Sequence, residues 1–221
     1  MNMLFCSKNE HYKVLDMSNK DNKYNDMTLE LLSAVEADSR ITQRNLASTL
    51  GIALGLTNSY LKKCIDKGLV KIKQVPANRY AYYLTPRGFT EKSRLTAEYL
   101  KASFSFYRRA KTDLTNIMDN CYTNNKLKIV LSDFSELSEI ATIISLSRDI
   151  KLVGIIGSKD SDTVLNNIPV ITNINSFNKF DAIIITDIYN TKSRYEYLST
   201  IISPKKLMVP DLISFDNIGD T

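Results

Sequence analysis

The sequence predicts a fold in three parts: a small α+β domain, a long linking helix, and an α/β domain built on a parallel sheet. Residues 41–72 show two helical patterns broken at Gly51 and followed by two β-rich runs, whereas short β-branched runs alternate with helical patterns after residue 126. The charge divides in the same way. Residues 38–111 carry 15 Lys and Arg against 4 Asp and Glu, a net charge of +11, and residues 127–221 carry a net charge of −3.

The composition predicts a protein of the reducing cytoplasm. The three cysteines, Cys6, Cys64 and Cys121, lie far apart and lack the spacing of a disulfide framework or a zinc site. The start MNMLFC is too short for a signal peptide, and no apolar run reaches the roughly 18 residues of a membrane span. We therefore expect no export, no membrane partner, no metal and no cofactor.

The first unit is predicted to follow a polar tail at residues 1–26, which ends in SNKDNKYND and has no apolar period. Apolar residues at positions 27–35 then predict a first helix. Thr42 is a favourable N-cap for a second helix. Gly51 ends that helix, because glycine adopts the left-handed conformation of a helix C-terminus without strain.

A third helix is predicted at residues 54–67, and Gly68 closes it. The runs LVKIK and YAYYL, joined by QVPANR, predict a β-hairpin. Helix, turn, helix and hairpin in this order make a winged helix-turn-helix, which we place at residues 27–88. Two explanations of Gly55 stay open, because a missing side chain permits either close helix packing or a close approach of the backbone to phosphate.

The positive charge of this unit favours a polyanionic partner, and double-stranded DNA is the commonest one of that size. The third helix would enter the major groove, where the Asn58 amide can pair with adenine and Ser59 can pair with several bases. Lysines suit phosphates, and the wing tip suits the narrower groove. The predicted DNA-binding residues are Gln43, Arg44, Gly55, Thr57, Asn58, Ser59, Lys62, Lys63, Asn78 and Arg79.

The stretches ITQRNLASTLGIALGLTNSYLKKCIDKGLVKI and YAYYLTPRGFTEKSRLTAEYLK resemble the MarR-type winged-helix regulators associated with exopolysaccharide operons. The shared features are a glycine, a Thr-Asn pair, the strand entry KGLVK and the run YAYYLTPRGFTEKSRLT after the wing. The resemblance covers about residues 28–110 and implies a sequence-specific transcriptional regulator of polysaccharide or cell-surface genes. This chain departs from those regulators at Leu56, where they usually carry lysine, and in its shorter wing loop.

Thr85 as a cap and Pro86 in the first turn start a long helix, and we assign residues 89–121 to a dimerisation and linker helix. Apolar residues at heptad spacing predict a seam that pairs either with a second copy of the chain or with the C-terminal half of the same chain. The predicted seam consists of Leu100, Tyr107, Ala110, Leu114, Ile117 and Cys121. A homodimer would present two such third helices to half-sites about one turn of DNA apart.

The last domain is predicted at residues 127–215 and is Rossmann-like. The runs LKIVL, KLVGII, IPVIT, DAIIIT and KKLMV predict five buried parallel strands, with helices at residues 137–146 and 195–202. The stretch from KLVGII to DAIIITD resembles the CoA- or nucleotide-binding-like domains of polysaccharide-synthesis enzymes.

This domain is not expected to bind a dinucleotide. The turn after its first strand reads SDFSELSE, which lacks glycine and puts a negative charge where phosphate would sit. We expect the domain to serve dimerisation or the sensing of another ligand. The crevice to inspect lies at the strand ends, near Ser132, Asp133 and Gly157.

The sequence carries no motif of an enzyme: the GxSxG, Walker, HExxH and CxxC patterns do not occur, and the single histidine, His11, lies in the predicted tail. The favoured class is a non-enzymatic DNA-binding regulator that acts as a homodimer, with an unidentified small-molecule effector. Two other classes stay open: a sugar-nucleotide enzyme with an accessory winged helix, and a winged helix for protein interaction that does not bind DNA.

Overall fold

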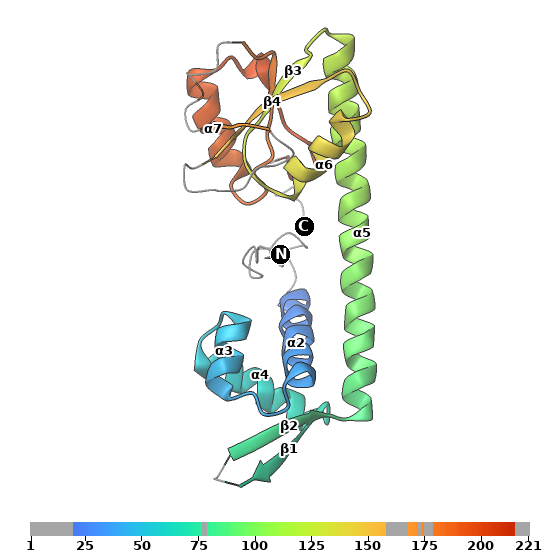
Figure 1. Ribbon diagram of the computed structural model, residues 1–221, viewed down its shortest axis with the longest axis vertical. Coiled ribbons are helices and arrows are strands. Elements are labelled where there is room, and N and C mark those ends of the chain that lie inside the picture. The colour runs from blue at the N-terminus through green and yellow to red at the C-terminus, as the bar shows by residue number, and fades with distance from the viewer. Residues whose placement is uncertain (1–19, 77–78, 158–167, 172–173, 175–178, 215–221) are drawn as a thin grey trace. The chain divides into compact units, whose positions relative to one another are not determined.

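The computed structural model describes residues 20–76, 79–157, 168–171, 174 and 179–214 (Figure 1). The chain divides into two compact units between residues 104 and 105. This division falls inside the helix α5 (Pro86–Thr123), which begins in the first unit and ends in the second. Among the described residues, no helix is long and apolar enough to cross a bilayer.

The first unit is a winged helix-turn-helix, as predicted. It contains the helices α2 (Lys20–Ala37), α3 (Gln43–Leu50) and α4 (Leu54–Asp66), followed by the antiparallel strands β1 (Val70–Val75) and β2 (Arg79–Leu84) and the start of α5. Buried apolar residues of α2, α3, α4 and the hairpin form one core. This shared core fixes the position of α4, whose outer face stays free of the core.

Helix α2 begins earlier than the sequence predicted. Residues 20–26, expected to belong to a polar tail, are helical, while residues 1–19 of that tail lie outside the described part of the chain. The reason is a contact that composition does not reveal: the Tyr24 ring stacks on Tyr60 of α4, with 5.6 Å between the ring centroids and 28° between the planes. An aromatic pair of this kind gives the first turns of α2 a packing partner.

The turn between α3 and α4 confirms the predicted capping. Thr42 accepts a hydrogen bond from the Asn45 backbone N–H at 3.1 Å, which satisfies one free donor at the start of α3. Gly51 ends the helix with φ 61°, and its N–H points at the carbonyl oxygens of Ala47 and Ser48. A side chain at this left-handed position would be strained, so glycine here sets the direction in which α4 leaves the turn.

The start of α5 is held against the entry to β1. The Thr85 hydroxyl donates to the Gly68 carbonyl oxygen at 2.6 Å and accepts from the Gly88 N–H at 3.0 Å. A Cβ atom at Gly88 would lie 2.1 Å from the Leu69 carbonyl oxygen, well inside any normal contact. Only glycine therefore permits this approach of helix to strand.

The second unit is a parallel α/β fold. Its strands are β3 (Lys128–Leu131), β4 (Lys151–Ile156), β5 (Val170–Ile171), β6 (Ala182–Ile184) and β7 (Leu207–Met208), in the spatial order β5-β4-β3-β6-β7. All four pairings are parallel. The helices α6 (Glu136–Ser145) and α7 (Thr191–Ile201) follow β3 and β6, and the short 3-10 helices η2 (Pro204–Lys206) and η3 (Asp211–Ile213) flank β7.

All five predicted strands and both predicted helices of this unit are present. In this spatial order, β3 connects to β4 on one side and β6 connects to β7 on the other, so the direction of winding reverses between β3 and β6. Such a reversal leaves a crevice beyond the carboxyl ends of the strands in open parallel sheets.

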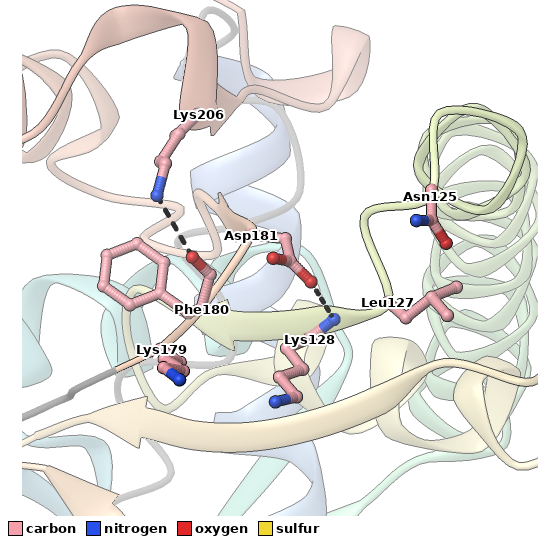
Figure 2. A pocket seen from close by; sticks show the side chains of 7 residues that line it. All are labelled: Asn125, Leu127, Lys128, Lys179, Phe180, Asp181 and Lys206. Carbon is pink, nitrogen blue, oxygen red and sulfur yellow. Dashed lines mark hydrogen bonds between the residues drawn. The ribbon is translucent and has the colours of Figure 1, made fainter.

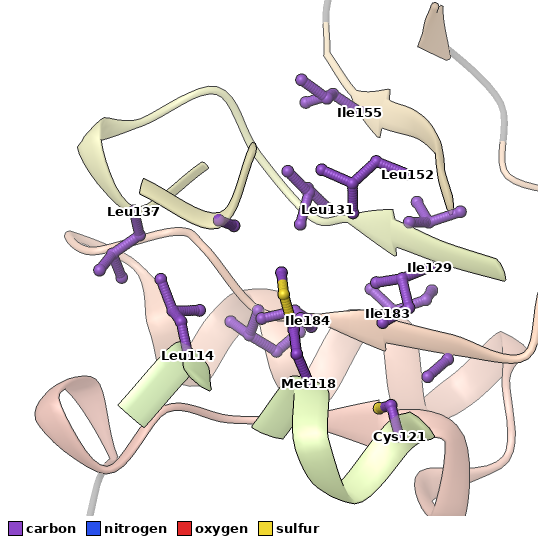
Figure 3. Packing of buried hydrophobic residues seen from close by; sticks show 14 of the residues in the cluster. Leu114, Met118, Cys121, Ile129, Leu131, Leu137, Leu152, Ile155, Ile183 and Ile184 are labelled. Atoms are coloured by element: carbon purple, nitrogen blue, oxygen red, sulfur yellow. The ribbon is translucent and has the colours of Figure 1, made fainter. Parts of the chain in front are cut away.

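The last turns of α5 pack into the core of this second unit (Figure 3), which corrects the predicted dimer seam. Ala110, Leu114 and Cys121 are buried among the strands' side chains, and Ile117 packs against the same core. Since these side chains are used inside their own chain, they are not available to a second copy. Leu100 and Tyr107, in contrast, remain 45% and 40% exposed.

Candidate nucleic-acid interface

The outer face of α4 is the predicted surface for DNA, and most of it is open to solvent. The buried side of the helix is formed by Thr57, Leu61 and Cys64. Ser59, Lys62 and Lys63, which alternate with these positions, are exposed, and Asn58 is half-buried at the edge. The helix therefore turns polar and basic side chains outward while an apolar stripe holds it on the core.

Thr57 is wrongly placed among the predicted DNA-binding residues. Its side chain is completely buried, and its hydroxyl donates to the Ala53 carbonyl oxygen at 3.2 Å. Its spacing from Leu61 and Cys64 already puts it on the inner face of the helix, where it cannot reach a ligand in the groove.

Asn58 has an unusual environment for a residue expected to read a base. Its carboxamide oxygen is buried and finds no hydrogen-bond partner among the residues that the structure describes. A buried acceptor without a partner costs about 1 to 3 kcal/mol. Rotation of this amide toward a base edge would remove that cost, so the site holds an acceptor that gains from a partner outside the chain.

The two lysines of the site differ in their surroundings. Lys62 is exposed, whereas the Lys63 ammonium lies 5.5 Å from the Tyr24 ring centroid and 5.9 Å from that of Tyr60. Lys67, which the sequence interpretation did not single out, lies 4.6 Å from the Tyr24 centroid. These cation–π contacts are each worth about 0.5 to 1 kcal/mol at an exposed site, so they hold Lys63 and Lys67 next to α2 without removing their charge from the surface.

Helix α3 contributes Gln43 and Arg44, both exposed at its first turn. The Gln43 amide nitrogen donates to the Tyr82 hydroxyl of β2 at 3.1 Å, so Gln43 joins the helix-turn-helix to the wing. Arg44 remains a candidate for a phosphate contact, because a guanidinium at a helix start beside a groove can reach the DNA backbone.

The wing adds positive charge that the predicted site did not include. Lys71 and Lys73 on β1 are exposed, as is Arg87 at the start of α5. The signal for them in the sequence is the alternation KIK, which puts both lysines on one side of the strand. At the wing tip, Asn78 lies outside the described residues, and Arg79 opens β2.

Gly55 lies in the first turn of α4, where it is exposed and has nothing within 4 Å of the position that a Cβ atom would take. Close packing within the described part of the chain therefore does not explain this glycine. The N-cap, Ala53, offers no side-chain hydrogen bond to the N–H groups of this turn. Uncapped N–H groups at a helix start attract anions, which favours the alternative of a close approach to phosphate.

Hydrogen bonds link the strand ends at the predicted ligand crevice of the second unit. The Ser132 hydroxyl accepts from the Thr186 N–H at 2.9 Å, and the Thr186 hydroxyl donates to the Asp133 carbonyl oxygen at 2.7 Å. These bonds join the ends of β3 and β6 where the winding reverses. Gly157 follows β4 at the same edge of the sheet.

A charged group covers this junction. The Arg194 guanidinium lies 3.9 Å from the Asp133 carboxylate and 3.5 Å from that of Asp187, which is almost fully buried. The edge where dinucleotides bind in related topologies thus holds a cross-linked polar cluster with two carboxylates, which suits a phosphate poorly.

Comparison with known proteins gives a family match in the first unit. The family described as winged helix-turn-helix DNA-binding matches residues 24–71, which is less than half of the chain. This segment contains α3, the turn and the whole of α4, so the exposed face described above lies within the part of the chain that matches this family. No curated protein matches the chain.

Three solved structures are similar in part. The PcaV transcriptional regulator from Streptomyces coelicolor is 17% identical, with a TM-score of 0.36 over 43% of this chain and 71% of that one. The same regulator in complex with its natural ligand is 16% identical, with a TM-score of 0.34 over 48% of this chain and 82% of that one. MepR, a transcription regulator of the Staphylococcus aureus multidrug efflux pump MepA, is 12% identical, with a TM-score of 0.36 over 66% of this chain and 95% of that one. Sequence identities and TM-scores this low carry no argument about function.

Proposed function

We propose that the chain is a sequence-specific, DNA-binding transcriptional regulator. The observation that supports this best is the exposed polar face of α4, which carries Asn58, Ser59 and Lys62 within a segment that matches a DNA-binding family. The net charge of +11 over residues 38–111 supplies the attraction to a polyanion, although Lys92 and Arg94 are paired with carboxylates of their own chain.

The proposed contacts are of two kinds: some read base edges and others hold phosphates. Asn58 and Ser59 read base edges, because amide and hydroxyl groups distinguish donor and acceptor patterns in the major groove. Lys62, Lys63 and Arg44 hold phosphates, because a charged group senses a feature that every sequence shares. The first turn of α4 at Gly55 approaches a phosphate through its backbone N–H groups.

We further propose that the regulator acts as a homodimer through the exposed part of α5. Leu100, Phe104 and Tyr107 are 45%, 58% and 40% exposed. Their spacing of four and three residues puts them on one side of the helix, so they form a stripe that a second copy would cover. The targets suggested by the sequence resemblance are polysaccharide or cell-surface genes.

A salt titration of the full chain on a random DNA duplex tests DNA binding. Each phosphate contact lowers log K by about 0.9 per unit of log salt, so a site with four or more contacts gives a slope of about −4 or steeper. Lys62→Gln should make the slope shallower by about one contact, whereas Lys192→Gln, on the exposed side of α7, should leave it unchanged. A flat salt response contradicts the proposal.

Sedimentation tests the dimer separately. Phe104→Asp puts a charge in the proposed contact stripe, and the expected result is a monomer that keeps its helical content. A wild-type chain that sediments as a monomer, or a dimer unaffected by Phe104→Asp, would move the interface away from this stripe.

A further inference from the structure

The second unit has a cavity that lies at the other end of its sheet from the predicted crevice. It has a volume of about 550 Å³. Its lining consists of Asn125, just after the end of α5, and of Leu127, Lys128, Lys179, Phe180, Asp181 and Lys206 (Figure 2). Lys128 begins β3, Asp181 immediately precedes β6, and Lys206 immediately precedes β7. Because these strands are parallel, their starting ends meet at one edge and bring the lysines together.

The charge of this cavity is opposite to that of the domain around it. Residues 127–221 carry a net charge of −3, yet the cavity wall holds three lysines and one carboxylate. That carboxylate, Asp181, accepts the Lys128 backbone N–H at 2.8 Å, and neither Lys128 nor Lys179 forms an ion pair within the described residues.

One of the lysines is held in place before any ligand arrives. The Lys206 ammonium donates to the Phe180 carbonyl oxygen at 3.1 Å and lies 5.0 Å from the centroid of the Phe180 ring. An ammonium has three donors, so two remain for an anion. Phe180 and Leu127 give the same cavity an apolar wall, which an inorganic ion alone would not use.

The geometry points to a binding site for a phosphorylated small molecule in this cavity, and we propose that function for it. Lysine binds phosphate as a point charge, whereas planar carboxylates are best held by the two-pronged contact of arginine, which the lining lacks. The volume lies within the range of about 300 to 1,000 Å³ that small-molecule sites occupy, so the phosphate would carry an organic body that rests on Phe180 and Leu127. The proposal does not depend on DNA binding by the first unit.

The probe for this site is phenyl phosphate, which combines one phosphate group with one apolar ring. It is added to the ¹⁵N-labelled full chain at constant ionic strength, and amide shifts are followed by NMR. The expected result is saturable binding with a Kd of about 1 mM or tighter, with the largest shifts at Lys128, Asp181 and Lys206. Sulfate, which lacks the ring, and benzoate, which lacks the phosphate, should each bind at least about tenfold more weakly.

Lys179→Gln is the test variant, because Lys179 is exposed and outside every helix and strand, so its loss leaves the sheet intact. It should weaken phenyl phosphate binding about tenfold, while Lys192→Gln on α7 should leave binding within about twofold. Unsaturable shifts, equal binding of sulfate, or no effect of Lys179→Gln would overturn the proposal. Shifts at these residues with a DNA duplex and not with phenyl phosphate would also overturn it, since the cavity would then be part of a nucleic-acid surface.

Discussion

Two glycines in the first turns of helices should respond to the same substitution in opposite ways. Gly88→Ala introduces a Cβ atom 2.1 Å from the Leu69 carbonyl oxygen and 3.0 Å from its carbonyl carbon. Because both atoms belong to the backbone, α5 or β1 must move by about 1 Å to restore a normal contact. Gly55→Ala, in contrast, adds a methyl group to open space in α4.

The magnitudes follow from these contacts. Overpacking of this kind costs about 1 to 3 kcal/mol, and the shift also strains the hydrogen bond from the Thr85 N–H to the Leu69 carbonyl oxygen, 3.0 Å long and worth about 1 kcal/mol. Gly88→Ala should therefore lower the free energy of unfolding by about 2 to 4 kcal/mol. Gly55→Ala should leave it unchanged or raise it by up to about 1 kcal/mol, since alanine favours a helix over glycine.

Urea denaturation followed by circular dichroism measures both effects. The two variants form a matched pair, because each adds one methyl group within the first turn of a helix of the same unit. Equal stability of the two variants would refute the account of the α5 start, and a large loss in Gly55→Ala would refute the view that this glycine lies in open space. If the backbone at Gly55 approaches phosphate, Gly55→Ala should also weaken binding to every DNA sequence while the protein stays folded.

Further predictions concern the buried part of α5 and the thiol of α4. Leu114→Ala should lower the free energy of unfolding by about 2 to 5 kcal/mol, because Leu114 is completely buried in the chain's own core. Leu100→Ala should lower it by under about 1 kcal/mol in unfolding experiments on the isolated monomer, because Leu100 is exposed there. Equal losses would show that Leu100 is packed like Leu114, as in the continuous seam that the sequence predicted. Burial raises the pKa of the Cys64 thiol from 9.0 to about 11, so at pH 8 its thiolate is about a hundredfold scarcer than that of an exposed cysteine. Alkylation of Cys64 by iodoacetamide should be slow in native protein and fast in urea, and equal rates would show that the thiol is open to solvent.

Local rules predicted the features of this fold that depend on few residues. Thr42 and Gly51 form the caps that their chemistry favours, and the continuous β-branched runs in the last domain marked its short buried strands. In α4, the helical spacing of the apolar residues put Ser59 and Lys62 outward, as the structure has them.

The features that the sequence did not predict depend on contacts between parts of the chain that are distant in the sequence. An apolar seam on α5 looks the same whether a second chain or its own sheet covers it, and the buried Leu114 shows that the sheet covers the later half. The run around Tyr24 has no apolar period, yet one aromatic contact with Tyr60 extends α2 through it. In the sequence, Gly88 looks like an ordinary residue in the first turn of a helix, because only the folded chain brings the Leu69 carbonyl group close to it.

The proposed reading of DNA by α4 is tested most directly by Asn58→Ala and Lys62→Ala on two duplexes, one selected from a random pool by the wild-type chain and one unselected. Loss of the amide should weaken binding to the selected duplex by about 1 to 3 kcal/mol and change binding to the unselected duplex little, because only a base edge senses its donor and acceptor pattern. Loss of the ammonium should weaken both nearly equally. Since the Asn58 carboxamide oxygen has no hydrogen-bond partner among the described residues, Asn58→Ala removes no bond at that atom, and its melting temperature should equal or exceed that of the wild type. An equal loss on both duplexes, no loss on either, or the failure of the wild type to select any sequence would contradict the assignment of α4 as the helix that reads DNA.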